Sequence, residues 1–476
     1  MKKYLIACLL VLSQINYSQE KVGSINYEIE NSKGIYSIVD EQEKKVLLIF
    51  NDKTKIDYIA LDETFQQTAK ISIIDESKGK NEYLGYSKNN QTYYTYWRNS
   101  KEETIEVKEV HLDKNTVTTS KIPFALEKEV IFNSATINNI FYVLSIIKNT
   151  DILNIYTFKD GQMNKKSIDN SNLKFVNSEN KSINFWKLYS ENNGTIYSDG
   201  FRNITTKTNG SLVLSTQKKK SYIDGDSIIL SFDNNYTFNQ NLIINLKDYT
   251  VTQKVVQQET MILRDEFSHT NSNSFILNHK VFLVKTSDEQ IFLTVKNLDN
   301  NLLKEIIYTS DKTSDFINSD IVQEHGSINK KRVLEKPKQF TRKVHELNPA
   351  ITGVYEDNKY IISVGGVSYP EQNNAIMIGG MLGGITGALI GALISYNNYS
   401  QGINSYANRK VVYLKCVLDE NFNHVNEKTE DSNFDKLRGF IENDKINSYQ
   451  TIFELNKNLI YSGYDKKTKT YNLYKF

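Results

Sequence analysis

The chain has 476 residues, of which 24% are charged and 39% hydrophobic, and it contains four prolines. This length suffices for one large domain or for two to three ordinary ones, and the composition excludes disordered, collagen-like, coiled-coil and disulfide-scaffold proteins. The 58 basic residues nearly balance the 56 acidic ones, so no global field would draw the chain to nucleic acid.

The amino terminus has the plan of a secretory signal peptide. Two lysines precede the apolar residues 4–12, and polar residues continue to Ser18. The apolar run is too short to span a bilayer. We expect residues 1–18 to be removed, which leaves 56 basic and 56 acidic residues. The mature protein, residues 19–476, would then reside in the periplasm, in the outer envelope or outside the cell.

The chain has two cysteines, Cys8 and Cys416. A lipobox-like run ends at Cys8, but cleavage there would leave too short an apolar core for a signal peptide. After cleavage at Ser18 only Cys416 remains, so an internal disulfide is excluded and a packed core must supply the stability. Because Cys416 lies in the apolar run 411–418, we expect a small buried hydrophobe rather than a nucleophile.

One hairpin pattern recurs along the chain: a short apolar run, a polar turn and a second alternating run. The paired runs are 46–50 with 57–65, 93–97 with 105–112, 141–146 with 153–158, 228–232 with 242–246, 281–284 with 292–298, 360–364 with 411–418, and 459–462 with 471–476. The first hairpins start about fifty residues apart, which is the length of a four-stranded propeller blade. Longer later intervals predict elaborated units.

These hairpins predict an all-β fold, a β-propeller of about seven blades. In repeat length and hairpin pattern, from about residue 24 to 476, the chain resembles uncharacterised secreted propeller-like proteins of bacteria. Since no Trp-Asp or Gly-Gly blade signature recurs, the resemblance implies a fold and no active site. The last run, 471–476, would pair with an early strand such as 24–29 and close a ring. The alternative is two β-sandwich domains divided near the charged stretch before Pro349.

A basic stretch precedes Pro349. Within a short segment, Glu335 and Glu346 are the only acidic residues against seven basic ones: Lys330, Lys331, Arg332, Lys336, Lys338, Arg342 and Lys343. These side chains could face the headgroups of anionic lipids, or the stretch could be a solvated linker or an outer strand. Nucleic acid is not expected as a partner, because the mature chain is exported and neutral.

An apolar, glycine-rich insertion, residues 370–409, separates the two runs of the sixth hairpin. Residues 375–394 contain one polar side chain, Thr386, and no charge; as a helix they would be about 30 Å long, which matches a hydrocarbon core. Four glycines recur at every fourth position and two lie beside them: Gly379, Gly383, Gly387 and Gly391, with Gly380 and Gly384. Over these residues alone the chain resembles glycine-zipper segments of bacterial envelope proteins, which implies close helix packing.

The position of the insertion within a hairpin restricts its topology. A single membrane crossing is disfavoured, because the polar return, residues 395–408, would have to come back through hydrocarbon. Four interpretations remain. The segment could lie on or dip into a bilayer, pair with another helix, fold back as two short helices, or pack on the propeller as an apolar loop.

The sequence shows no recognisable chemistry. Gly-x-Ser-x-Gly, a phosphate-binding Gly-rich loop and an EF-hand loop are absent, and the six histidines are scattered: His111, His269, His279, His325, His345 and His424. The turn 224–226 could ligate calcium, but its Asp-Gly-Asp sequence is typical of an ordinary turn. The aromatic runs 93–97 and 185–186 could stack on a carbohydrate, with core packing as the default. We therefore predict no catalytic, cofactor-binding or metal-binding residues and no cofactor.

These observations predict an exported, non-catalytic interaction or scaffold protein of the cell envelope or surface, which associates with a membrane surface or a partner helix through residues 375–394. A protein or glycan partner is left unspecified. The alternative is a secreted propeller enzyme acting on glycans or peptides. Asp, Glu or His side chains that converge at one end of the channel would favour the enzyme, and a lining of Asn, Ser and apolar groups would favour the binder.

Overall fold

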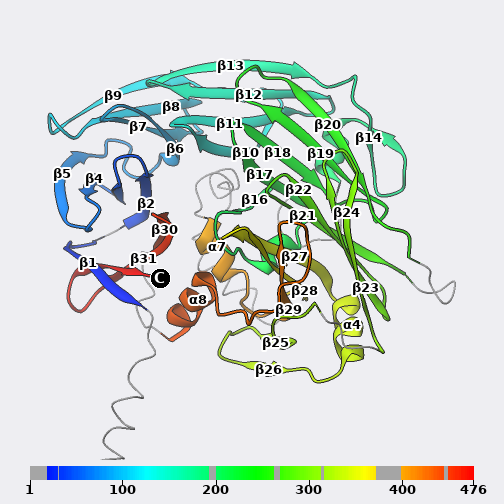
Figure 1. Ribbon diagram of the computed structural model, residues 1–476. Coiled ribbons are helices and arrows are strands. Elements are labelled where there is room, and N and C mark those ends of the chain that lie inside the picture. The colour runs from blue at the N-terminus through cyan, green and yellow to red at the C-terminus, as the bar shows by residue number, and fades with distance from the viewer. Residues whose placement is uncertain are drawn as a thin grey trace, which may run out of the picture. The chain divides into compact units, whose positions relative to one another are not determined.

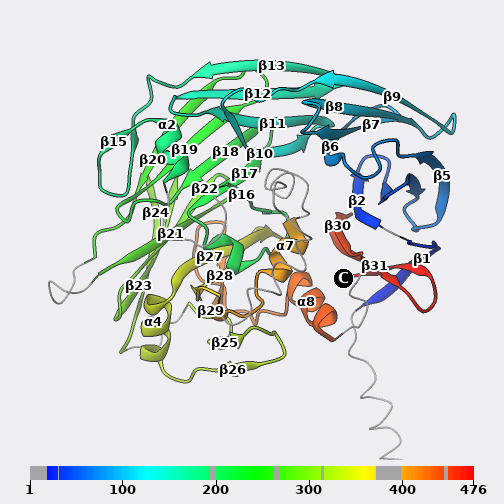
Figure 2. The same cartoon turned by 180° about the vertical axis from the view of Figure 1, so that it is seen from behind.

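The computed structural model describes residues 19–30, 32–191, 200–261, 269–311, 316–370, 398–443 and 449–476 (Figure 1). The chain divides into two compact units. The first takes its described residues from Met1–Ser72 and Asp431–Phe476, and the second takes them from Ile73–Glu430. Strands dominate both units, and the reverse view shows the same separate sheets (Figure 2).

The first unit contains two four-stranded antiparallel sheets. One follows chain order: β2 (Ser32–Asp40), β3 (Lys45–Asp52), β4 (Lys55–Leu61) and β5 (Gln67–Ile74). The other has the order β1 (Glu20–Asn26), β32 (Thr470–Lys475), β31 (Asn458–Asp465) and β30 (Thr451–Leu455). Ile25 lies opposite Tyr471, so the first described strand pairs with the last strand of the chain. This confirms the predicted pairing, although β1 starts before residue 24.

The second unit contains five sheets of four or five strands among its described residues. The first three follow chain order. One consists of β6 (Glu82–Asn89), β7 (Thr92–Asn99), β8 (Thr104–His111) and β9 (Thr116–Pro123), and the next of β10 (Glu129–Ile137), β11 (Ile140–Ile147), β12 (Ile152–Lys159) and β13 (Gln162–Asp169). The third has a short parallel edge strand, β16 (Arg202–Asn203), followed by β17 (Lys219–Asp224), β18 (Ser227–Phe232), β19 (Phe238–Asn245) and β20 (Val251–Gln257).

The last two sheets of this unit differ in how their strands are ordered. One is a simple meander: β21 (Asn271–Leu277), β22 (Lys280–Thr286), β23 (Gln290–Asn297) and β24 (Leu302–Thr309). The other has the order β26 (Lys331–Val333), β25 (Val322–His325), β29 (Lys410–Asp419), β28 (Lys359–Val367) and β27 (Asn348–Glu356). Its central strand, β29, therefore comes last in the chain, after the strands on both sides of it. We refer to this five-stranded sheet as the insertion blade.

Tight turns explain why the hairpins form where they do. In several sheets two consecutive residues with positive φ connect the first two strands, as in a type I′ hairpin turn, which suits Asn and Asp: 138–139, 278–279, 357–358 and 456–457. Such turns twist in the same sense as the strands that they join. The local sequence therefore fixes the register of each hairpin.

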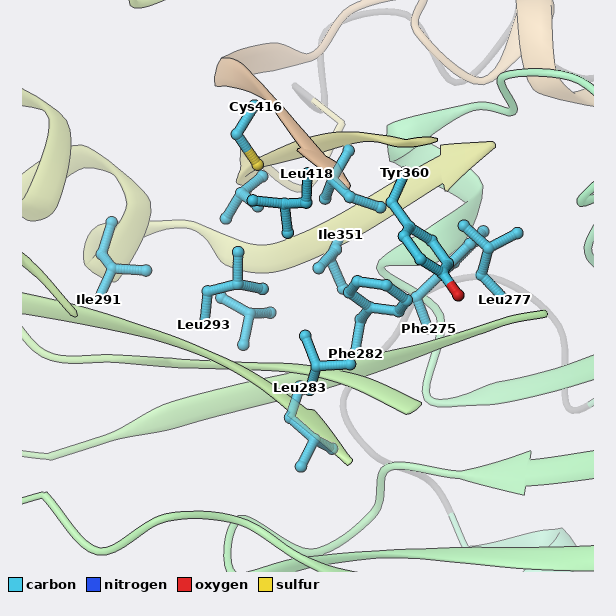
Figure 3. Packing of buried hydrophobic residues seen from close by; sticks show 14 of the residues in the cluster. Phe275, Leu277, Phe282, Leu283, Ile291, Leu293, Ile351, Tyr360, Cys416 and Leu418 are labelled. Atoms are coloured by element: carbon cyan, nitrogen blue, oxygen red, sulfur yellow. The ribbon is translucent and has the colours of Figure 1, made fainter. Parts of the chain in front are cut away.

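Apolar clusters lie between successive sheets. One cluster joins β6–β9 to β10–β13, and a second joins β10–β13 to β16–β20. The largest joins the β16–β20 sheet, the β21–β24 sheet and the insertion blade. In this cluster Phe282 and Tyr360 face each other, with ring centroids 5.4 Å apart (Figure 3). Cys416 points into this cluster with none of its surface exposed. The expectation of a small buried hydrophobe is confirmed.

Connecting segments account for the long intervals between hairpins. Before β17 the chain forms the two-stranded sheet β14 (Phe175–Val176) and β15 (Ser182–Ile183) and the helices α2 (Phe185–Ser190) and α3 (Leu212–Ser215). Before β27 it forms α4 (Pro337–Glu346), and before β29 it forms α7 (Asn398–Asn404). In the first unit α8 (Asn433–Asn443) contacts β31. The predicted elaborated units are thus confirmed.

The fold is all-β and is built from propeller-type blades, as predicted. All seven predicted hairpins are adjacent antiparallel pairs, including the sixth, in which Tyr360 lies opposite Leu418 across the insertion. The series of four- and five-stranded antiparallel sheets, most of them in meander order, corresponds to propeller blades rather than to the alternative of two β-sandwiches. The outer strands β5, β9 and β13 are largely exposed and rich in lysine and threonine, which protects open sheet edges from further pairing.

Two predicted segments lie outside the described residues: the signal peptide, 1–18, and all of the apolar run 375–394 with its six glycines. The two ends of the insertion, 370 and 398–409, are described. No helix in the described ranges is long and apolar enough to cross a membrane.

Candidate functional site

The two ends of the insertion meet at one end of the insertion blade. Val367 at the end of β28 lies opposite Val411 at the start of β29. Just beyond this pair, the amide of Ser368 donates to the carbonyl of Lys410 at 2.8 Å, and Arg409 Nη1 donates to the carbonyl of Ser368 at 2.8 Å. The segment that leaves the blade and the segment that returns to it are therefore held side by side.

Hydrogen bonds to the segment before α3 hold the returning arm. The amide of Leu212 donates to the hydroxyl of Tyr406 at 3.1 Å, and Thr208 Oγ1 donates to the hydroxyl of Tyr399 at 3.2 Å. Because α7 is tied to a neighbouring blade in this way, the position of the insertion's carboxyl-terminal end does not depend on the insertion itself.

The β25–β26 hairpin brings basic residues to the same end of the blade. His325 lies opposite Lys410, and Glu324 lies opposite both Val411 and Lys331. The turn starts at Gly326, whose φ of +69° is accessible to glycine and whose amide donates to the carbonyl of Arg409 at 2.8 Å. Residues 326–331 therefore lie beside the ends of the insertion.

Helix α4 carries the remaining basic residues. It starts with Pro337 at its first turn and packs on the sheet through the buried Phe340 and Val344. Gly366 on β28 permits this packing, because a Cβ there would lie 3.0 Å from the Cα of Val344. The helix leads into β27, whose first residue lies opposite Val367. Its carboxyl-terminal turn is therefore at the insertion end of the blade.

The seven predicted basic residues lie on the surface of one blade. All are exposed except Lys343, which is half-buried: Lys330, Lys331, Arg332, Lys336, Lys338, Arg342 and Lys343. Lys330 and Lys331 lie at the insertion end, whereas Lys336 and Lys338 precede or begin the helix. The stretch is thus an edge strand and a helix surface rather than a linker.

A subset of these residues converges on one face of the sheet. Gln323 on β25 lies opposite Arg332 on one side and Val412 on the other, and its Oε1 accepts a hydrogen bond from Arg332 Nη2 at 2.8 Å. Val412 belongs to the apolar cluster with Val344 of α4. Since side chains two residues apart on a strand share a face, Lys410 lies on this α4-covered face as well.

The charges in this subset act on one another. Burial lowers the pKa of the Lys343 ammonium, and the nearby charges of Arg332, Lys410 and Arg342 lower it further. The carboxylate of Glu346 opposes this shift, but it is also 3.6 Å from Arg342 Nε. We call Arg332, Arg342, Lys343 and Lys410 the cationic cluster. It combines two strands and a helix that are far apart in the sequence.

A histidine pair lies next to the cationic cluster. The rings of His269 and His345 have centroids 4.4 Å apart, and His345 belongs to the last turn of α4. Burial and the proximity of His269 lower the pKa of His345. The histidines that are scattered in the sequence therefore include one pair that is adjacent in the fold. Because the two residues are distant in the sequence, only the packing of α4 beside the segment before β21 could reveal it.

A buried polar network connects three blades elsewhere in the second unit. Lys220 Nζ lies 2.5 Å from Asp233 Oδ2, with both side chains buried, and it also donates to Asn273 Oδ1. Asp233 accepts from Ser274 Oγ at 2.9 Å, and Asn273 Nδ2 donates to the carbonyl of Pro349 at 3.0 Å. Asp233 is paired with Lys220, and the nearby ammonium of Lys218 donates to the carbonyl of Ser272 at 2.6 Å, so these groups support a structural role for the network.

The remaining sequence candidates have structural roles. Asp224 lies 2.7 Å from His279 Nδ1 and Asp226 lies 2.6 Å from Lys247 Nζ, so both carboxylates of the 224–226 turn contact side chains of the protein. Tyr93, Tyr96, Trp97 and Phe185 are buried, which confirms core packing for these aromatic residues, whereas Tyr94 and Trp186 are half-buried. Within the described residues, no group of three or more His, Cys, Asp and Glu side chains could hold a metal ion.

Comparisons with known proteins add no family. No protein-family model matches the chain, and no curated protein matches it. Among solved structures, the WD40 domain of SCAP from fission yeast is 10% identical, with a TM-score of 0.31 over 96% of this chain and 97% of that chain. The β-propeller domain of the Trilobed protease from Pyrococcus furiosus is 13% identical, with a TM-score of 0.26 over 65% of this chain and 80% of that chain.

A protein from Lactobacillus plantarum is 11% identical, with a TM-score of 0.27 over 71% of this chain and 82% of that chain. These likenesses are too weak to carry an argument about function. The assignment of propeller-type blades therefore depends on the sheet topology of the chain itself.

Proposed function

We propose that this protein is an exported, non-catalytic interaction or scaffold protein of the cell envelope, which associates with an anionic membrane surface through its insertion blade. One observation carries the proposal. The register of β28 and β29 brings both ends of the apolar insertion to the end of the blade where Lys330, Lys331 and Lys410 lie. Apolar and basic residues are thus attached to the same end of one sheet.

The paired ends favour surface attachment over a single crossing. Residues that leave at Val367 and return at Val411 start and finish on one side of any membrane. A segment of residues 375–394 that enters the bilayer from this side must also leave on it. A segment lying in the interface, or two short helices that fold back, satisfies this condition without exposing backbone to hydrocarbon.

The basic residues supply the second attachment signal. A lysine or arginine near an anionic leaflet contributes about 1 kcal/mol, and a single weak apolar anchor needs such support for stable binding. The mature chain has no net charge. Attraction to an anionic surface must therefore come from a local set of cations such as this one.

Vesicle flotation tests the proposal. Mature protein, residues 19–476, is mixed with vesicles of phosphatidylcholine alone or with phosphatidylglycerol added. We expect flotation with the anionic vesicles only. A variant in which residues 374–396 are replaced by a Gly-Ser linker of equal length, which retains α7 and its hydrogen bonds, should lose flotation.

A charge-reversal pair separates the specific basic residues from net charge. Lys330→Glu/Lys331→Glu should reduce flotation at least tenfold. The matched control, Lys101→Glu/Lys114→Glu, changes the net charge equally in exposed turns of another blade and should float like the wild type. Equal flotation of all variants contradicts association through the insertion blade, and flotation of none, the wild type included, contradicts membrane association.

Self-association through the glycine positions is the competing outcome. Light scattering in the absence of lipid distinguishes it, because a protein that assembles through the insertion would be oligomeric in solution and would become monomeric when the linker replaces residues 374–396. A monomer that floats with anionic vesicles supports the membrane proposal. Amino-terminal sequencing of the protein from its own cells tests export, with Gln19 as the expected first residue.

A further inference from the structure

We propose that the cationic cluster binds a phosphate group, held by Arg332, Lys343 and Lys410 on the α4-covered face of the insertion blade. This inference rests on the proposed function, since it names the chemical group that the basic surface recognises. The same chemistry is offered by a lipid with a phosphomonoester headgroup and by a soluble phosphorylated compound.

The cluster is assembled by the fold and not by the local sequence. Arg332 comes from β26, Lys343 from α4 and Lys410 from the first position of β29. Gln323 on β25 aligns these elements, because it pairs with Arg332 across one ladder and lies two residues from His325, the partner of Lys410, along its own strand. Three cations from three elements therefore face one region.

Among the described residues, Glu346 is the acidic side chain whose charge acts on Lys343, and it lies within ion-pair distance of Arg342 rather than of Lys343. In the described part of the chain neither Lys343 nor Lys410 forms an ion pair. The buried carboxylate of Glu324 lies on the opposite face of the sheet, where it accepts a hydrogen bond from the hydroxyl of Tyr413 at 2.9 Å. Glu346 is shared with the exposed Arg342 at 3.6 Å. Like charges held close together cost folding free energy, and an anion bound between them would remove that cost.

The geometry of Arg332 favours a tetrahedral oxyanion. Its Nη2 donates to Gln323 Oε1 at 2.8 Å, which orients the guanidinium plane. A guanidinium has five N–H donors in a fixed fork, so donors remain for two oxygens of one phosphate, whereas the ammonium groups act as point charges on the others. A dianionic phosphomonoester gains more from three cations than a monoanionic phosphodiester does.

Thermal unfolding in solution provides the first test. Trp97 and Trp186 both belong to the second unit, so their fluorescence reports on the unit that contains the cluster. Sodium phosphate at pH 7.5 should raise the Tm of the mature protein in a saturable way, and sodium sulfate or chloride at equal ionic strength should raise it less. Lys343→Met, Lys410→Met and Arg332→Gln should each raise the phosphate concentration needed for half of the maximal Tm increase at least fivefold.

The control variant lies on the same helix. Lys338→Met removes an exposed cation from the first turn of α4, one turn before Arg342 and outside the three residues proposed to hold the phosphate, and should keep the wild-type phosphate response. If Arg332→Lys restores less than half of the phosphate response, the guanidinium fork is required. If phosphate stabilises the wild type no more than sulfate and chloride do, or if Lys338→Met weakens the response as much as Lys343→Met does, the inference is overturned.

Vesicles distinguish the source of the phosphate and separate this inference from the proposed function. Phosphatidate and phosphatidylglycerol are compared at equal total surface charge. Preferential flotation with phosphatidate that Lys343→Met abolishes assigns a lipid headgroup. A phosphate response in solution without such preference supports the inference and assigns a soluble phosphorylated ligand. Flotation with both lipids and no phosphate response leaves the proposed function standing and overturns the inference, and a phosphate response without any flotation does the reverse.

Discussion

Two regions of the second unit differ in whether the charges of their lysines are paired with carboxylates. Lys220 on β17 has no exposed surface, and it is matched by Asp233 at 2.5 Å and by the amide oxygen of Asn273. Lys343 and Lys410 at the insertion end of the blade are partly exposed and lie beside Arg332 rather than beside a matching carboxylate. One set of cations is neutralised within the fold, and the other is left for solvent or a ligand.

The difference separates structural charge from functional charge. A buried ammonium is tolerated only where a carboxylate and further hydrogen bonds replace its water, so Lys220 fixes how β17, β18 and β21 pack together. A partly exposed cluster of like charges contributes nothing comparable to the fold. Its geometry is therefore better explained by something that it attracts.

The largest expected effect comes from breaking the buried pair. Lys220→Met leaves the carboxylate of Asp233 buried without its counterion, and we expect a loss of about 3–5 kcal/mol in the free energy of unfolding. Denaturant titration followed by tryptophan fluorescence measures this loss. The double variant Lys220→Met/Asp233→Leu removes both charges and should recover part of it. A loss below about 1 kcal/mol for the single variant would show that Lys220 is not structural.

Separating α4 from the sheet should have the next largest effect. Phe340→Ala removes a buried ring that contacts Tyr308, with ring centroids 5.3 Å apart, and should cost about 3 kcal/mol. Cys416 is a probe of this loss of packing, because its thiol is fully buried in the wild type and burial raises its pKa to about 12. Labelling by a thiol reagent at pH 8 should be at least tenfold faster in Phe340→Ala than in the wild type. Val333→Ala on the exposed edge of β26 serves as the control and should not change the rate.

Removing the cluster's lysines should cost little or nothing. Lys343→Met/Lys410→Met relieves repulsion with Arg332, so we expect the free energy of unfolding to stay the same or to rise by up to about 1 kcal/mol. Added sodium chloride screens the same repulsion and should therefore stabilise the wild type more than the double variant. If the double variant unfolds as readily as Lys220→Met, the cluster belongs to the structural category and the contrast between the two regions disappears.

The sequence predicted the hairpins because their apolar residues alternate and short polar turns join them. It did not reveal the inner strand β21, which begins with Asn-Ser-Asn-Ser and reads as a loop. In the structure Ser272, Asn273 and Ser274 are buried, and the Lys220–Asp233 pair and nearby carbonyl groups satisfy the side chains of Asn273 and Ser274. Hydrophobicity fails as a guide wherever hydrogen bonds replace apolar contacts inside a strand.

The candidate site was predictable only in part. The basic stretch and the insertion are visible in the sequence, but their proximity depends on the four residues of β25 pairing with the start of β29. Lys410 joins Arg332 only through that register, and the basic residue next to Lys410 in the sequence, Arg409, is buried. Long-range strand order, which Figure 1 shows for β25 to β29, carried the missing information.

The smallest expected effect concerns the histidine pair at the edge of the cluster. His269, Asp288 and Glu346 are the charged or titratable groups that act on His345, and its pKa lies below 6.5, chiefly because of burial and then because of His269. Between that lowered pKa and 6.5 the unfolded chain binds more protons than the folded chain, so stability rises with pH through this window and is reduced below it. His345→Gln should therefore lose less stability than the wild type on acidification from pH 7.5 to pH 5. We expect the difference in Tm loss to be on the order of 1 °C, measured by tryptophan fluorescence.

His325→Gln, at an exposed position of the same blade, should behave like the wild type. A larger acid-induced Tm loss in His345→Gln than in the wild type would mean that protonated His345 is stabilised by Asp288 and Glu346, and that this edge of the cluster attracts a proton instead of repelling it.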